Sequence, residues 1–412
     1  MRVMVNILVI LSLLFCSACD DVKVYPWNDA WNETETPQDQ ESPEESETPD
    51  GPEDEQTPEE PSEPEAPSEP ETPADPETPE EPEIPEEPSE PEIPEEPSEP
   101  ETPEPEEPET PEVQTPEGWM DVTSQFGDLP SYLRILKASS TLEGKKAVAY
   151  VAEADMTQAD WDVWSVRAGD DYKTSDSYKT PSEVYNEKGA SVVINGGYFF
   201  YEKGNYTSSL AVSNSEVLAY NINYASEDWV DVYYPTRAAF LESTDGTYDA
   251  CWTYMSWAGH WMYPSPAENS WESKPQNQPN AQYPAGAKTF AAKTGIGGGP
   301  VLIDGGKLVN TYEQEMFQAY KDVSTCTNQP RTAIGVTADN KMIFFVCEGR
   351  GMTAGVNGLT TEDVANVLID LGCVEAINLD GGGSSCMLVN GKETIKGSDG
   401  SQRAVASAVM LK

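Results

Sequence analysis

The stretch from Asn378 to Gly391 reads NLDGGGSSCMLVNG and places an acid and three consecutive glycines after a short apolar strand. A connection that only needs a turn can use one or two glycines. Three in a row give up more backbone entropy on folding, so they need a reason. Either the backbone adopts conformations closed to other residues, or something bulky approaches it closely.

The segments around this stretch predict more strands than helices. Turns between β-rich runs predict hairpins in VLIDGGKLV (301–309), TAIGVTADNKMIFFV (332–346) and CMLVNGKETI (386–395). SVVIN (191–195) reads as a strand before two glycines, and RAVASAVML (403–411) reads as a closing strand. Because hairpins pair neighbouring strands, these patterns predict a largely antiparallel sheet.

The clearest helix is TTEDVANVLIDLG (360–372). Thr360 can cap it, Asp363 sits three residues further on, and Gly372 stops it. One apolar stripe runs along it, formed by Val364, Val367, Leu368 and Leu371. Together with the strands, this predicts an α+β fold with an antiparallel β-sheet core and a few helices, not a doubly wound sheet.

The N-terminus, MRVMVNILVILSLLFCSACDD, has the layout of a bacterial lipoprotein signal peptide over residues 1–19. Its apolar run is too short to span a bilayer. Small residues precede Cys19, which is then the lipid-bearing first residue of the mature chain, although Cys16 stands where Leu is usual. The alternative is a signal peptide cut nearby without lipid. In both cases we expect an exported protein, and with the lipid one anchored to the bacterial outer membrane or cell surface.

Residues 20–117 are predicted to be a disordered tether. From 28 to 117 the chain is rich in Glu, Pro, Thr and Ser, has no Lys or Arg, and carries about half of the 74 acidic residues. Such a composition cannot bury enough surface to offset chain entropy, and proline and charge repulsion favour an extended chain. The formal net charge of −50 therefore belongs mostly to the tether. It argues against nucleic acid as a partner.

The remaining residues, 118–412, are long enough for one folded domain with a Trp-rich insertion at about 201–290. Tryptophans in polar surroundings can stack on sugar rings, although tryptophans more often belong to a core. This insertion carries Trp229, Trp252, Trp257, Trp261 and Trp271. Beyond the two cysteines of the signal peptide, the five cysteines show no CxxC spacing, so the sequence signals neither a zinc site nor a dense disulfide framework.

Several kinds of active site are excluded by what the chain lacks. His260 is the single histidine and fits packing better than catalysis, and no GxSxG motif exists, so a serine triad is not expected. A histidine-rich metal centre is excluded in one chain. The glycine cluster 295–307 lacks the Ser or Thr of a P-loop. Carboxylates, arginines, amides, hydroxyls and exposed backbone remain.

These remaining groups recur at the ends of predicted strands. Each cluster alone is typical of a tight turn, but acids, arginines and glycines at successive strand ends together predict a site. The clusters are Asn195–Phe199, Gly297–Pro300, Arg331–Thr332, Glu348–Arg350 and Asn378–Ser385.

The ordered motifs NGGYF, GGGPVLI, RTAIGV, EGRG with GLT, and INLDGGGSS resemble the phosphodiester glycosidase family, over about 190–412. Glu348 stands where the family pattern has Asp. The resemblance implies hydrolysis of a sugar 1-phosphodiester to free sugar and a phosphomonoester, with a carbohydrate phosphodiester or glycan as the substrate. A phosphate is already a good leaving group, so the chemistry needs no histidine acid.

On this interpretation, Asp380 is the first choice for nucleophile or base and Glu348 the second. Arg331 and Arg350, with the amides of Gly381, Gly382 and Gly383, are expected to hold the phosphate. Asn195, Ser384 and Ser385 are expected to orient sugar hydroxyls or water. The remaining predicted substrate-binding residues are Gly196, Gly299 and Asn378. No cofactor is required, and a bound calcium is compatible with the composition.

Two other functions stay open at this point. The tethered domain is also compatible with a carbohydrate-binding or adhesion protein without turnover. A metal-dependent phosphodiesterase would use Asp304, Glu348 and Asp380, and it ranks third because no histidine ligands accompany them. In every case we expect a monomer that contacts the membrane only through its lipid.

Overall fold

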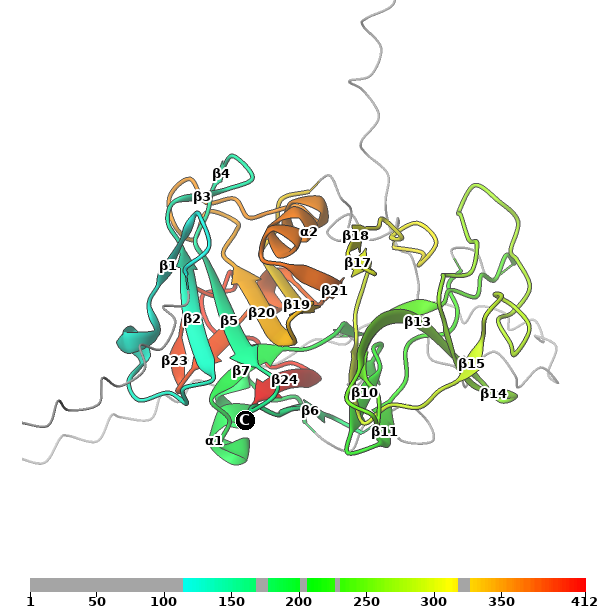
Figure 1. The fold of residues 1–412 in the computed structure, drawn as a ribbon. Helices are drawn as coiled ribbons and strands as arrows, with labels where there is room; N and C mark the ends of the chain where they lie inside the picture. The colour runs from blue at the N-terminus through cyan, green and yellow to red at the C-terminus, as the bar shows by residue number, and fades with distance from the viewer. Residues whose placement is uncertain (1–113, 168–176, 201–205, 227–229, 318–326) are drawn as a thin grey trace, which may run out of the picture. The chain divides into compact units, whose positions relative to one another are not determined.

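The computed structural model describes residues 114–167, 177–200, 206–226, 230–317 and 327–412 (Figure 1). The predicted signal peptide, Cys19 and nearly all of the predicted tether lie outside these residues. None of the helices in the described ranges combines the length and apolar character that crossing a bilayer requires.

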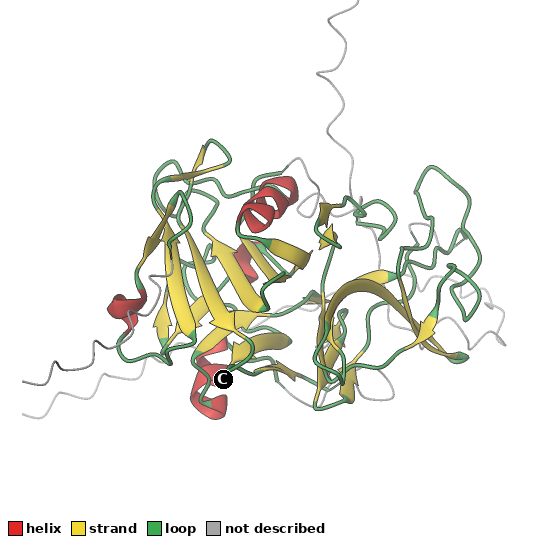
Figure 2. Ribbon diagram, in the orientation of Figure 1, coloured by secondary structure: helices red, strands yellow, loops and turns green. Residues whose placement is uncertain are grey.

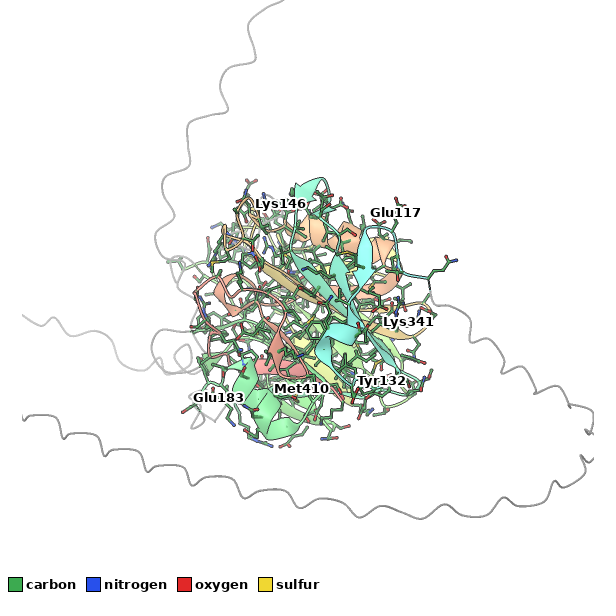
Figure 3. All side chains as sticks on the ribbon, turned by 90° about the vertical axis from the view of Figure 1, so that its left-hand side faces the viewer. Glu117, Tyr132, Lys146, Glu183, Lys341 and Met410 are labelled. Atoms are coloured by element: carbon green, nitrogen blue, oxygen red, sulfur yellow. The ribbon has the colours of Figure 1, made fainter. Side chains whose placement is uncertain are left out.

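The largest sheet has eight strands among the described residues, and every pairing in it is antiparallel. Figure 3 views it from the side of β1, with Lys341, the first residue of β20, and Lys146 labelled. In spatial order its strands are β1 (Trp119–Asp121), β2 (Leu133–Ala138), β5 (Ala149–Asp155), β20 (Lys341–Cys347), β19 (Arg331–Thr337), β21 (Cys373–Asn378), β17 (Val301–Asp304) and β18 (Lys307–Leu308).

A second sheet has five strands and a third has seven, again antiparallel. The five-stranded sheet has the order β23 (Lys392–Glu393), β22 (Met387–Val389), β7 (Val192–Asn195), β24 (Ser407–Leu411) and β6 (Trp161–Ser165). The seven-stranded sheet has the order β11 (Glu216–Ala219), β10 (Ala211–Ser213), β16 (Thr294–Gly297), β12 (Arg237–Glu242), β13 (Tyr248–Ser256), β14 (Gly259–Tyr263) and β15 (Lys288–Thr289). Two small hairpins are β3 (Thr141–Leu142) with β4 (Lys145–Lys146), and β8 (Phe199–Phe200) with β9 (Tyr206–Thr207).

Two α-helices occur in the described residues, α1 (Pro181–Lys188) and α2 (Thr361–Asp370), and strands dominate the remainder (Figure 2). The predicted capping box of α2 is present, because Thr360 accepts from the Asp363 backbone and Asp363 accepts from the Thr360 backbone. Its apolar stripe packs on the eight-stranded sheet. Helix α1 was not predicted, although Thr180 and Glu183 form a capping box there as well.

The three predicted hairpins are confirmed as β17 with β18, β19 with β20 and β22 with β23. The antiparallel, β-rich core is confirmed with them. The closing strand is shorter than predicted, since β24 begins at Ser407. Before it, Val405 forms an isolated bridge with Lys179, and Arg403 lies outside the strand with its guanidinium on Asp399 and Ser384.

The predicted Trp-rich insertion supplies most of the seven-stranded sheet. Trp252 and Trp261 are buried in it, as the core interpretation expects, while Trp257 is 78% exposed at the tip between β13 and β14. Trp271 packs on Tyr233; Trp229 lies outside the described residues. His260 is packed, since its ring stacks on Phe290 with 3.8 Å between ring centroids.

The four cysteines in the described ranges, Cys251, Cys347, Cys373 and Cys386, are buried free thiols. Burial raises the pKa of each thiol. The fifth, Cys326, lies outside the described residues.

Glu375 on β21 gives a pH-dependent contribution to stability. Its carboxylate accepts the backbone N–H groups of Gly305 (3.0 Å) and Ala250 (3.2 Å). Burial, then the charges of Asp249 and Asp304, raise its pKa from 4.5 to about 7. Between these two pH values the folded protein holds a proton that the unfolded chain releases, so stability falls as pH rises through the window.

We therefore expect Glu375→Gln to lose part of this pH dependence. The difference in free energy of unfolding between pH 5 and pH 8, measured by urea titration, should be smaller in the variant than in the parent. An unchanged difference would show that Glu375 is ionised normally in the folded protein.

Candidate active site

The register of the eight-stranded sheet gathers several predicted site segments at one end. Arg331 opens β19 and pairs with Cys347, so Glu348 follows immediately at the end of β20. On the other side of β19, Ala333 pairs with Asn378, which ends β21. Asp380 therefore leaves the sheet at the same end as Arg331 and Glu348.

Asn195, the last residue of β7, ties the five-stranded sheet to this end. Its amide nitrogen donates to the carbonyls of Asp380 (2.7 Å) and Gly196 (3.3 Å). Its carbonyl oxygen accepts the Thr332 hydroxyl (2.7 Å) and the Cys386 N–H (3.1 Å). All four hydrogen-bonding positions of the amide are thus used, and the side chain is 1% exposed. Asn195 therefore positions the Asp380 loop. The sequence had instead predicted that its side chain orients sugar hydroxyls or water.

Asp380 is largely buried at the start of the glycine turn. Its Oδ1 accepts the Gly381 N–H (2.9 Å), and its carboxylate is also hydrogen-bonded to Ser384. Burial raises the pKa of Asp380 from 3.8 to about 6, although these two hydrogen bonds and the nearby Arg403 and Arg350 pull it down. A carboxyl group whose pKa is close to neutral pH is suited to act as a general base or nucleophile.

Each of the three glycines is approached closely by a different segment. A Cβ at Gly381 would lie 2.7 Å from the Pro330 carbonyl oxygen, and one at Gly382 would lie 2.8 Å from a guanidinium nitrogen of Arg350. A Cβ at Gly383 would overlap the Arg403 guanidinium. Close approach is therefore the reason for the three glycines, and the groups that approach belong to the protein.

The predicted anion nest is only partly available for a ligand. The Gly381 N–H donates to the Asp380 side chain, and the Gly382 N–H donates to the Pro330 carbonyl (2.9 Å). Gly382 has φ +60°, a left-handed conformation that favours glycine. The main role of the turn is therefore to position Asp380, because the N–H groups of Gly381 and Gly382 are already hydrogen-bonded within the protein.

Arg331, which was predicted to hold the phosphate, is buried at the start of β19. Its Nε donates to the Leu359 carbonyl (3.0 Å) and its Nη2 to the Thr327 carbonyl (2.8 Å), and the residue is 2% exposed. The bond to Leu359 joins the start of β19 to the segment before α2, and the bond to Thr327 holds the segment that leads into β19. Arg331 thus stabilises the side of the site formed by the segments around Thr327 and Leu359, which we call the site wall.

Glu348 is 3% exposed and faces the loop before β24. Its Oε1 accepts the Lys396 N–H (3.0 Å), while its Oε2 is buried without a hydrogen-bond partner in the described part of the chain. Glu348 thus supports the loop that carries Asp399 and Arg403.

Gly299 and Asn378 are hydrogen-bonded to each other at the end of β21, two residues before Asp380. The Gly299 carbonyl accepts the Tyr198 hydroxyl (2.8 Å) and the Asn378 amide (3.0 Å). The pKa of Tyr198 is raised by burial and by the Asp380 charge, so the phenol stays protonated. In the described residues, the Asn378 Oδ1 and the Ser385 Oγ are buried without partners.

Asp304 lies away from this cluster. It ends β17, whose Val301 pairs with Ile377, so it lies toward the opposite end of β21 from Asp380. The three carboxylates of the predicted metal-dependent alternative are therefore not gathered at one point. In the described residues, no group of three or more His, Cys, Asp or Glu side chains is arranged to hold a metal ion.

Arg403, Asp399 and Tyr198 are the site residues that the sequence did not assign. Tyr198 belongs to the quoted NGGYF motif, but its hydroxyl contact with Gly299 joins residues 101 positions apart. Asp399 and Arg403 form an ion pair (2.6 Å) in a polar segment with no apolar periodicity. Only the fold places that segment beside Asp380.

Comparison with known families matches residues 188–412 to the model of the phosphodiester glycosidases. A curated relative, the SPbeta prophage-derived uncharacterized protein YomE of Bacillus subtilis (strain 168), is 37% identical over 82 residues. That match spans 20% of this chain and 12% of the length of YomE.

Among solved structures, the catalytic domain of zebrafish N-acetylglucosamine-1-phosphodiester alpha-N-acetylglucosaminidase, auto-inhibited by its pro-peptide, is 20% identical. That similarity has a TM-score of 0.45 and covers 71% of this chain and 88% of the zebrafish chain. A hypothetical protein from Synechocystis is 16% identical, with a TM-score of 0.44, and the similarity covers 72% of this chain and 69% of the other.

Proposed function

Because the chain belongs to the phosphodiester glycosidase family, we propose that it hydrolyses a sugar 1-phosphodiester at the anomeric carbon–oxygen bond. The products are the free sugar and a phosphomonoester. The observation that carries this proposal is the Asp380 carboxylate, held on a glycine turn with Arg350 and Arg403 close to it.

In the proposed reaction, the bond from the anomeric carbon to the phosphate oxygen breaks, and its electron pair leaves with the phosphate. Asp380 either attacks the anomeric carbon, forming a glycosyl ester that water then hydrolyses to the free sugar, or takes a proton from water that attacks the anomeric carbon directly. Cationic groups stabilise the charge that develops on the leaving phosphate. The reaction as proposed requires no cofactor, because the leaving group needs no protonation by a metal-bound water.

Hydrolysis of a panel of synthetic sugar 1-phosphodiesters in water labelled with heavy oxygen tests this function. We expect the label in the released sugar, also in buffer with a chelator. Label in the phosphomonoester would mean cleavage of the phosphorus–oxygen bond and would overturn the proposal. Saturable binding of these compounds without hydrolysis would instead indicate a carbohydrate-binding protein that is not an enzyme.

We also propose, from the first 117 residues of the sequence alone, that Cys19 carries lipid and that an extended tether holds the domain away from a bacterial membrane. The substrate would then meet a monomeric domain outside the cytoplasm.

A further inference from the structure

Two guanidinium groups from separate loops close on the turn that follows Asp380. Arg350 comes from the loop after β20 and packs against Gly382, while Arg403 comes from the loop before β24 and packs against Gly383. Arg350 is exposed and the Arg403 side chain is 30% exposed, whereas Arg331 is 2% exposed. A ligand that arrives from solvent therefore meets Arg350 and Arg403 before Arg331.

We propose that Arg350 and Arg403 form a clamp for the substrate phosphate, and that Arg403 is the second phosphate ligand in place of Arg331. The inference rests on the proposed function and names the residues that recognise its leaving group. A phosphodiester carries one negative charge on two unesterified oxygens, which suits two planar guanidinium forks. Arg331, bonded to the carbonyls of Thr327 and Leu359, keeps its role in the wall.

Asp399 is the positioning residue of this clamp. Its Oδ2 accepts from both Nε (2.9 Å) and Nη2 (2.6 Å) of Arg403, which fixes the plane of the fork. Arg403 Nη1 donates to the Ser384 hydroxyl (3.3 Å), and Ser384 is in turn bonded to Asp380. One chain of contacts thus connects the clamp to the proposed catalytic carboxylate.

The clamp has a consequence for the substrate class. Negative charge on the phosphate grows as the carbon–oxygen bond breaks, so two cations stabilise the transition state more than the bound substrate. A glycoside with a neutral phenolic leaving group gives the clamp nothing to hold. We therefore expect sugar 1-phosphodiesters to be hydrolysed and the matching aryl glycosides to be poor substrates that are indifferent to Arg403.

The experiment compares the full-length parent with R403Q, R403K, R350Q, D399N and the control Lys274→Gln, whose side chain is 85% exposed. Binding of inorganic phosphate is measured by calorimetry, and hydrolysis by kcat and KM. We expect R403Q and R350Q each to weaken phosphate binding about 10- to 100-fold, as for a lost charge-assisted hydrogen bond, and to lower kcat/KM at least as much. R403K and D399N should fall between R403Q and the parent, and Lys274→Gln should match the parent.

Thermal melts establish that each variant is folded, and D399N keeps the test valid if R403Q does not fold. Parent-like phosphate binding by folded R403Q, or by folded D399N in that case, would overturn the clamp, whether or not sugar phosphodiesters are hydrolysed. Phosphate binding that depends on Arg403, in a protein that hydrolyses none of the panel, would instead retain the clamp and overturn the proposed function.

Discussion

Replacing Asp380 by Asn is expected to lower kcat by about three to five powers of ten while KM changes little, as for the loss of a group that acts mainly in the transition state. The fold should survive, because Asn keeps the size of the side chain and still offers an oxygen to the Gly381 N–H. In the parent, the pKa of about 6 predicts that kcat/KM rises as pH passes through that value and then levels off, since the ionised carboxylate acts.

Asp304→Asn is the matched control, because Asp304 ends β17 toward the opposite end of β21. It should leave kcat and KM as in the parent. An Asp380→Asn protein that is stable and within a few-fold of parental activity would remove Asp380 from the mechanism. Glu348→Gln would then be the informative variant.

Replacing Asn195 by Ala is expected to cost about 3–9 kcal/mol of unfolding free energy, from three buried polar groups left without a partner at about 1–3 kcal/mol each. Those groups are the Asp380 carbonyl, the Thr332 hydroxyl and the Cys386 N–H. That is a large share of the 5–15 kcal/mol by which domains are usually stable. Folded molecules should also lose about 100-fold in kcat, because the Asp380 loop is no longer fixed.

Glu242→Ala separates the loss of stability from the loss of activity. Glu242 is also buried, and its carboxylate accepts from the Trp161 indole (2.8 Å) and from Lys293 (2.8 Å), neither of which belongs to the Asp380 loop. It should lower the melting temperature and leave kcat near the parent below the melting transition. If both variants lose kcat equally at matched fractions of folded protein, Asn195 has only a structural role.

Local patterns were sufficient to predict the hairpins and helix α2, because each depends on residues a few positions apart. The capping box depends on Thr360 and Asp363, three positions apart, and the turn depends on the neighbours Asn390 and Gly391. Helix α1 carried the same kind of signal at Thr180, Pro181 and Glu183, but it is only eight residues long and lacks a clear apolar stripe.

The candidate site could be predicted only in part, because its decisive contacts are not local. The sequence motifs identified most of the site residues. Whether an arginine is exposed to solvent or buried against backbone carbonyls, however, depends on the fold. Arg331 and Arg403 look alike in sequence, and one is buried on carbonyls while the other reaches the glycine turn. The need for three glycines becomes clear only once the fold shows that Pro330, Arg350 and Arg403 pack against them.

The central place of β24 also determines when the protein can become active as its chain emerges and folds. This strand, Ser407–Leu411, lies between β7 and β6, and the Ser407 carbonyl accepts the Gly196 N–H (2.8 Å) next to Asn195. A chain that emerges N-terminus first on the outer side of the membrane can form the hairpin of β19 and β20 before Leu411 emerges. It cannot close the five-stranded sheet or fix the backbone at Gly196 until then. Premature termination a few codons early would thus yield a chain with every proposed catalytic and phosphate-binding residue and no working site.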